Sequence, residues 1–141
     1  MKSIPAACAT LGLVVLVTAV GATANTAPNT EPCRKHAATQ VALENCAAAG
    51  ERASQMRVDA AYAALEKVVR GAELRSVRAD ERAWLTYRKL NCASASGLGA
   101  PGSGTIATFV ALTCLTVRNK QRAAYLQWRA DPQRRNSQPM P

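Results

Sequence analysis

The helical pattern of this chain is clearest in ERAWLTYRKLNC, residues 81–92. Its apolar side chains recur at helical spacing, and the same pattern reaches back to residue 73. The apolar face of this helix carries Leu74, Val77, Trp84, Leu85 and Cys92. The sequence therefore predicts a helix over about residues 73–93, with Trp84 as the anchor of a hydrophobic core.

Two more helices flank this one. Residues 38–70 gather apolar side chains on one face, and Gly71 is placed to end that helix and to hinge a long helical hairpin. After the Gly-rich loop 94–104, residues 105–129 form a third helix whose first half has no charge. That half is too short to span a bilayer, so we expect it to lie between the other two helices. The predicted fold class is all-α, a disulfide-stapled three-helix domain.

Residues 1–24 have the pattern of a secretory signal peptide. Lys2 supplies the positive charge, an uncharged apolar run follows, and Ala22-Thr23-Ala24 has the small side chains of a cleavage site. An uncleaved membrane anchor is the alternative, but the apolar run is short for a span of about 20 residues. We expect cleavage after Ala24.

The rest of the chain divides into three parts. Residues 25–32 are polar with two prolines, which predicts a disordered lead-in. Residues 33–131 form the helical domain. Asp131-Pro132 is expected to stop the last helix, and residues 132–141 to form a flexible basic tail.

The predicted mature chain keeps four cysteines, namely Cys33, Cys46, Cys92 and Cys114. An even number of cysteines in an exported chain favours disulfides over metal ligands. There is no C-x-x-C pair, and His36 is the only histidine, so the sequence predicts neither a metal site nor a cofactor.

The formal net charge is +9, or +8 once Lys2 is removed with the signal peptide. Export argues against a nucleic-acid partner, and the basic residues are scattered along the chain. Outside the inner membrane, a basic protein meets anionic lipids, teichoic acid or lipopolysaccharide groups and acidic proteins.

One edge of the first predicted helix is acidic. It carries Glu44, Glu51, Asp59 and Glu66, and Glu73 continues the series. The second helix carries Arg75, Arg78, Arg82 and Lys89 beside its apolar face. The hairpin could pair the two edges with each other, at less than about 1 kcal/mol for each exposed pair. Otherwise the acidic stripe, defined here as Glu44, Glu51, Asp59 and Glu66, is a candidate binding surface.

Glu81 and Arg88 lie on the apolar face of the second helix, two turns apart. A buried charge needs a partner, so each must meet a polar group on another helix or open into a cleft. Arg118, one turn after Cys114, is the expected companion. Glu81, Arg88 and Arg118 therefore form a candidate polar cluster, either structural or facing a ligand.

Catalytic arrangements fit this sequence poorly. The one histidine lies in the cysteine-bearing arm, away from any nucleophile it could activate. The acids of the first helix point the same way and do not face each other across a cleft, as a glycosidase requires. The Gly-rich loop has no lysine after it, unlike a phosphate-binding loop. The sequence predicts that the protein is not an enzyme.

The spacing of these features resembles the LprI-type lysozyme-inhibitor family of small exported helical domains. The matching pieces are Cys33, Thr39-Gln40-Val41-Ala42-Leu43-Glu44-Asn45-Cys46, Tyr62, residues 81–92, Ser103-Gly104-Thr105-Ile106 and Cys114-Leu115-Thr116-Val117-Arg118. The most specific of them is W-x-x-x-R-x-x-x-C with a later C-x-x-x-R. The usual Asp-x-x-Leu-Asn-x-x-Tyr pattern of the first helix reads Gln55, Val58, Asp59 and Tyr62 here, so only the Tyr is kept. Glu81 stands where the family often has Gln.

This resemblance implies a periplasmic or secreted protein that inhibits lysozyme-type muramidases by occluding their cleft. Common lysozymes are basic, so inhibition needs either a local acidic patch, such as the acidic stripe, or an Arg or Lys side chain that enters the cleft. The alternative is a structural envelope protein whose basic surface binds anionic envelope polymers. Neither function needs nucleic acid or a membrane span after cleavage.

Four cysteines allow three pairings, and we predict the two local ones. Cys33–Cys46 would fold the N-terminal arm onto the first long helix, and Cys92–Cys114 would tie the second helix to the third across the glycine loop. Each closes a short loop, which corresponds to roughly 3 kcal/mol in the chain-entropy account.

The signal peptide makes a prediction for mass spectrometry of the exported protein. The mature chain is expected to begin at Asn25. A full-length species retained in the membrane would contradict both the assigned compartment and the argument for disulfides that rests on it.

Overall fold

The computed structural model describes residues 31–141. The predicted signal peptide and residues 25–30 of the predicted lead-in lie outside this range. Five helices and no strand occur in the described residues, which confirms the predicted all-α class. They are α1 (Glu31–His36), α2 (Gln40–Val68), α3 (Gly71–Ser96), α4 (Ile106–Ala130) and α5 (Pro132–Ser137).

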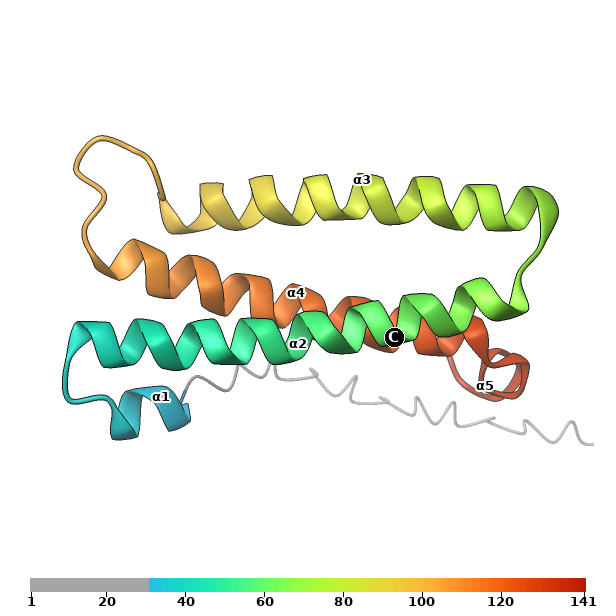
Figure 1. Ribbon diagram of the computed structural model, residues 1–141, viewed down its shortest axis with the longest axis horizontal. Coiled ribbons are helices and arrows are strands. Elements are labelled where there is room, and N and C mark those ends of the chain that lie inside the picture. The colour runs from blue at the N-terminus through green and yellow to red at the C-terminus, as the bar shows by residue number, and fades with distance from the viewer. Residues whose placement is uncertain (1–30) are drawn as a thin grey trace, which may run out of the picture.

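The three long helices α2, α3 and α4 form the body of the domain. Figure 1 shows α3 running back antiparallel to α2, and α4 packs along both of them. The α2–α4 seam is lined by small buried side chains: Ala47, Ser54 and Ala61 from α2, and Ala107, Ala111 and Ala123 from α4. Small side chains let two helix backbones approach closely. The central position predicted for the third helix is therefore correct.

The ends of the long helices fall within three residues of the predicted ends. Thr39 caps α2, because its Oγ1 accepts a hydrogen bond of 3.1 Å from the Ala42 amide. Gly97 ends α3 at a φ of 67°, a left-handed conformation that glycine adopts without strain.

The turn between α2 and α3 differs from the prediction that Gly71 ends the first helix. Val69 and Arg70 are extended, and Gly71 begins α3 at a φ of 56°. Val69 is buried in the core, and Arg70 Nη1 donates hydrogen bonds to the carbonyls of Val69 at 2.7 Å and Glu66 at 3.3 Å. The chain reverses here because a buried valine and a capping arginine hold two extended residues.

The hydrophobic core lies at the hinge end of the bundle. Its buried members are Val58, Ala61, Leu65, Val69, Val77, Ala123 and Leu126. Trp84 packs against this cluster but is only half-buried, so it lies at the edge of the core and not at its centre. The predicted role of Trp84 as the core anchor is accordingly shared with the fully buried Leu65 and Leu126.

The opposite end of the bundle is held by two disulfides. Cys33–Cys46 joins α1 to α2 and Cys92–Cys114 joins α3 to α4, with Cα atoms 5.6 Å and 5.5 Å apart. These are the two local pairings that the sequence favours. The hydrophobic cluster thus holds one end of the bundle, and the disulfides reinforce the other end, where Phe109 and Ala111 are also buried.

The C-terminal segment contains a helix where the sequence predicted none. Asp131-Pro132 does end α4, but Asp131 Oδ1 also accepts hydrogen bonds from the amides of Gln133 and Arg134, at 2.9 Å and 3.3 Å. Proline suits the first position of a helix, where its missing N–H is not needed. The same dipeptide therefore stops α4 and starts α5. No helix within residues 31–141 is long and apolar enough to cross a membrane.

The two disulfides differ in exposure, which predicts an order of reduction. Cys46 is exposed and Cys33 half-buried, whereas Cys92 is buried. Because thiol–disulfide exchange needs access to a sulfur atom, mild reductant should open Cys33–Cys46 first. Differential alkylation followed by peptide mass spectrometry measures the order, and earlier opening of Cys92–Cys114 would contradict the packing described here.

Candidate functional site

A buried ion pair joins α3 to α4 in the middle of the bundle. Glu81 and Arg122 are each 7% exposed, and Glu81 Oε2 accepts from Arg122 Nε at 3.0 Å and from Nη2 at 2.8 Å. Asp80, at the surface, accepts from the same Nη2 at 2.7 Å. Burial lowers the pKa of the Arg122 guanidinium, but the hydrogen bonds that it donates to Asp80 and Glu81 outweigh this effect, so the pKa is raised overall.

Aromatic rings enclose the arginine of this pair. The Arg122 guanidinium lies 5.2 Å from the ring centres of both Trp84 and Tyr125, and Arg88 lies 5.0 Å from the Trp84 ring. Cation–π contacts of this kind favour a guanidinium that has lost water. Trp84 therefore has a second role, since it bridges the two arginines that face the bundle interior.

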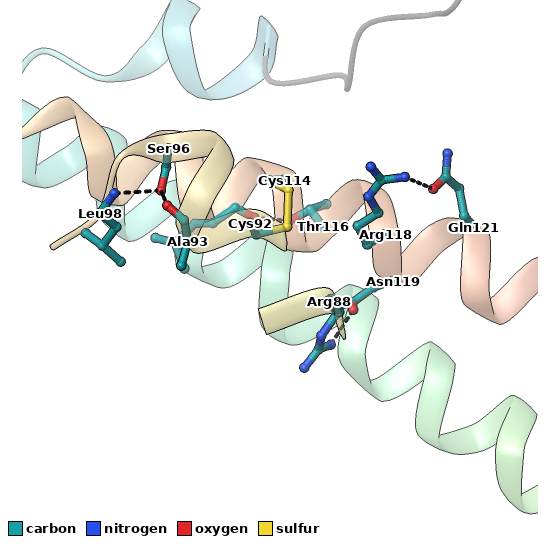
Figure 2. The surroundings of a disulfide bond; sticks show 11 residues. Arg88, Cys92, Ala93, Ser96, Leu98, Cys114, Thr116, Arg118, Asn119 and Gln121 are labelled. Carbon is teal, nitrogen blue, oxygen red and sulfur yellow. Dashed lines mark hydrogen bonds between the residues drawn. A yellow bond between two sulfur atoms is a disulfide. The ribbon is translucent and has the colours of Figure 1, made fainter. Parts of the chain in front are cut away.

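Arg88 belongs to a second polar group, which ties all three long helices together. Its Nη1 donates to Gln55 Oε1 on α2 and to Asn119 Oδ1 on α4 (Figure 2 shows the contact with Asn119). Asn119 is completely buried and donates through Nδ2 to Ser54 Oγ at 3.0 Å and to Glu51 Oε1 at 3.5 Å. Buried polar groups that satisfy one another in this way fix the register of the helices.

The structure separates the candidate polar cluster of Glu81, Arg88 and Arg118. Arg118 Nη1 donates to Gln121 Oε1 at 3.2 Å, and in Figure 2 its guanidinium points away from Arg88. Arg122, one turn further along α4, takes the place assigned to Arg118 as the partner of Glu81. The only signal in the sequence was the recurrence of arginine at i and i+4, which does not say which of the two faces inward.

The acidic stripe is not neutralised by the basic edge of α3. Only Arg78 of that edge reaches it, donating through Nε to Glu66 Oε1 at 2.8 Å. Hydrogen bonds from Arg78 and from the Tyr62 hydroxyl hold the pKa of the Glu66 carboxyl below its usual range. Within residues 31–141, Arg75, Arg82 and Lys89 form no ion pair. The predicted pairing of the two edges therefore holds at one position.

The other members of the stripe make hydrogen bonds within the protein. Glu44 and Asp59 accept from the side chains of Gln40 and Gln55, at 2.8 Å and 2.7 Å, and Glu51 accepts from Asn119. Asp59 is exposed, whereas Glu44, Glu51 and Glu66 are half-buried. The stripe is a row of separate carboxylates along α2 and not a continuous acidic surface.

A groove of about 780 Å³ opens beside the buried ion pair. Trp84, Arg122 and Tyr125 line one part of it, and Met140 and Pro141 of the C-terminal segment line another. Asp80 is the one acidic side chain among the lining residues, and Arg122 already binds it. The described residues contain no group of three or more His, Cys, Asp or Glu side chains that could hold a metal ion.

Comparison with known protein families gives one match. The family described as Lysozyme inhibitor LprI matches residues 33–126. The chain belongs to the LprI family. No curated protein and no solved structure matches it.

The region matched to the LprI family contains the features that shape this domain. It begins at Cys33, the first disulfide cysteine, and ends at Leu126, a buried residue of the core. Both disulfides, the Glu81–Arg122 pair and the Asn119 network lie within it. The segment with Trp128 and α5 lies beyond it, so the groove wall formed by Met140 and Pro141 is outside the matched region.

The ion pair predicts a large difference between two neighbouring substitutions. Arg122→Ala leaves the buried Glu81 carboxylate without its partner and should cost about 3–5 kcal/mol of unfolding free energy. Asp80→Asn is the matched control; the Asp80 side chain is 46% exposed, so the cost should stay below about 1 kcal/mol. Chemical denaturation measures both, and equal small effects would show that the pair does not hold α3 in place.

Proposed function

We propose that this protein is an exported inhibitor that binds lysozyme-type muramidases and occludes their substrate cleft. The observation that carries the proposal is the LprI family match over residues 33–126, because the family is described by that activity. The family is one of inhibitors, so the protein would act by stoichiometric binding and not by turnover.

The cysteines support a location in the periplasm or outside the cell. Disulfides persist in oxidising compartments, and here two of them hold one end of a small bundle. Together with the signal-like residues 1–24, they favour export to where muramidases act.

Electrostatics sets a condition on the complex. The mature protein has a net charge of +8, that is +9 without Lys2, and a basic lysozyme would be repelled at long range. Binding then requires local complementarity. On one side of the molecule, Glu44 and Asp59 of the acidic stripe form no ion pair within the described residues and would attract a basic lysozyme. On another side, exposed cations would attract the catalytic carboxylates of the muramidase.

The experiment measures lysozyme activity in the presence of purified mature protein with its disulfides intact. Two substrates are compared: an insoluble peptidoglycan suspension and a small soluble oligosaccharide. A protein that occludes the cleft should inhibit both, with full inhibition near one inhibitor per enzyme. The same protein after reduction and alkylation is the control and should have lost most of its effect, because the disulfides hold one end of the fold.

The two substrates distinguish inhibition from envelope binding. A protein that only coats anionic polymers would protect the insoluble substrate, would leave hydrolysis of the soluble one unchanged, and would lose its effect as salt is raised. That outcome would contradict the proposed function. It would support binding of anionic envelope polymers through the basic surface.

A further inference from the structure

The acidic side chains of α3 all turn towards α4. Glu73 accepts from Arg129 Nη2 at 3.4 Å, and Asp80 and Glu81 both bind Arg122. Arg78, on the other flank of α3, forms an ion pair with Glu66 of α2. The ion pairs that α3 forms with α2 and α4 therefore lie along the two edges of α3 that face these helices.

The outer side of α3 carries a row of positively charged side chains. Arg75, Arg82 and Lys89 are exposed, and none of them forms an ion pair in the part of the chain that the structure describes. Their spacing of seven residues keeps them on one side of the helix over about two turns at a time. No acidic side chain of α3 shares this side.

Next to this row runs a strip without charge. It consists of Ala79, Ala83, Tyr87 and Leu90, all of them exposed. Tyr87 is 54% exposed and Leu90 is 64% exposed, although both are large enough to gain from burial. The outer face of α3, defined as these four residues together with Arg75, Arg82 and Lys89, is thus an exposed apolar strip with a row of cations along one edge. Exposed tyrosine and arginine side chains on one face are typical of binding hot spots.

We propose that the outer face of α3 is the surface that enters the substrate cleft of the muramidase. This inference rests on the proposed function and names its contact surface. A muramidase cleft is concave and carries two catalytic carboxyl groups, which match a convex helix bearing cations. From residue 75 to residue 90 the helix presents about 22 Å of length to the cleft. Tyr87 and Leu90 then pack against the cleft wall, and Arg82 and Lys89 face the carboxylates.

The shape of the bundle suits this mode of binding. Figure 1 shows α3 along one margin of the molecule, with α4 and α2 on its other side. α3 is fastened inward through Val77, Glu81, Arg88 and Cys92, so its outer face is held on a rigid support. A helix that is ordered before binding loses little conformational entropy in the complex.

The test measures the inhibition constant of four variants against the soluble substrate. Tyr87→Ala and Leu90→Ser change the apolar strip, while Arg82→Gln and Lys89→Gln change the cationic row. Each is expected to weaken inhibition, the Tyr87 and Arg82 variants by at least about tenfold. Because all four residues are exposed, the thermal midpoint should stay close to that of the wild type.

Matched controls come from α2. Met56 is 70% exposed and Arg57 is exposed, so Met56→Ala and Arg57→Gln make the same kinds of change away from α3. Asp59→Asn probes the acidic stripe. The Met56 and Arg57 variants should leave the inhibition constant within about twofold, as for surface substitutions away from an interface, whereas a loss of inhibition in Asp59→Asn would place the contact on the acidic stripe instead.

Every other outcome contradicts either the proposed function or the proposed contact surface. A wild-type protein that does not inhibit overturns the proposed function itself. If the wild type inhibits but the α3 variants keep its inhibition constant, the contact surface proposed here is wrong, although the protein is still an inhibitor. The same holds if Asp59→Asn is the variant whose inhibition weakens. Loss in the Arg82 and Lys89 variants alone, with Tyr87 and Leu90 variants unaffected, also overturns it, because attraction of charge without packing is not insertion into a cleft.

Discussion

The placement of α3 depends on the buried ion pair between Glu81 and Arg122. Two charged groups that have each lost nearly all contact with water are tolerated only if they meet in good geometry. Sliding α3 by one turn along α4 would separate them and leave both buried without a partner. The pair thus selects a single register, and the rings of Trp84 and Tyr125 limit where the guanidinium can lie.

The inward face of α3 makes a different kind of contact at the hinge end, in the middle and at the far end of the bundle. Val77 enters the hydrophobic core at the hinge end, Glu81 and Arg88 form polar contacts in the middle, and Cys92 forms the disulfide at the far end. A domain of this size has a modest core, and its buried cluster is confined to one end. Away from that cluster, hydrogen bonds and a covalent bond therefore add to the burial of smaller apolar groups such as Ala107 and Ala111. Within residues 31–141, Arg75, Arg82 and Lys89 on the outer side of α3 form no ion pair, while its inner side is held in place.

Most of the fold could be predicted from the sequence, and the reasons are local. Helical periodicity gave the three long helices to within three residues of their ends, and the glycine loop separated the last two. The buried position of Glu81 also followed from periodicity, since it shares a face with Val77 and Trp84. These features depend on residues close together in the chain.

The parts that could not be predicted depend on contacts between helices. The sequence offered Arg118 and Arg122 one turn apart, and only the rotation of α4 decides that Arg122 meets Glu81. The acidic and basic edges looked complementary, but α4 packs along both α2 and α3, so that only Glu66 and Arg78 meet. The start of α5 at Pro132 was missed because a proline that ends one helix can begin the next.

Hydroxyl-radical footprinting tests the proposal that α3 presents its outer face to a muramidase. The mature protein is oxidised alone and in the presence of a basic lysozyme, and side-chain oxidation is read by mass spectrometry. Tyr87 and Leu90 should become protected in the complex, while the highly exposed Met56 on α2 should oxidise at an unchanged rate. Protection of Met56 with no change at Tyr87 and Leu90 would show that α2, and not the outer face of α3, contacts the muramidase.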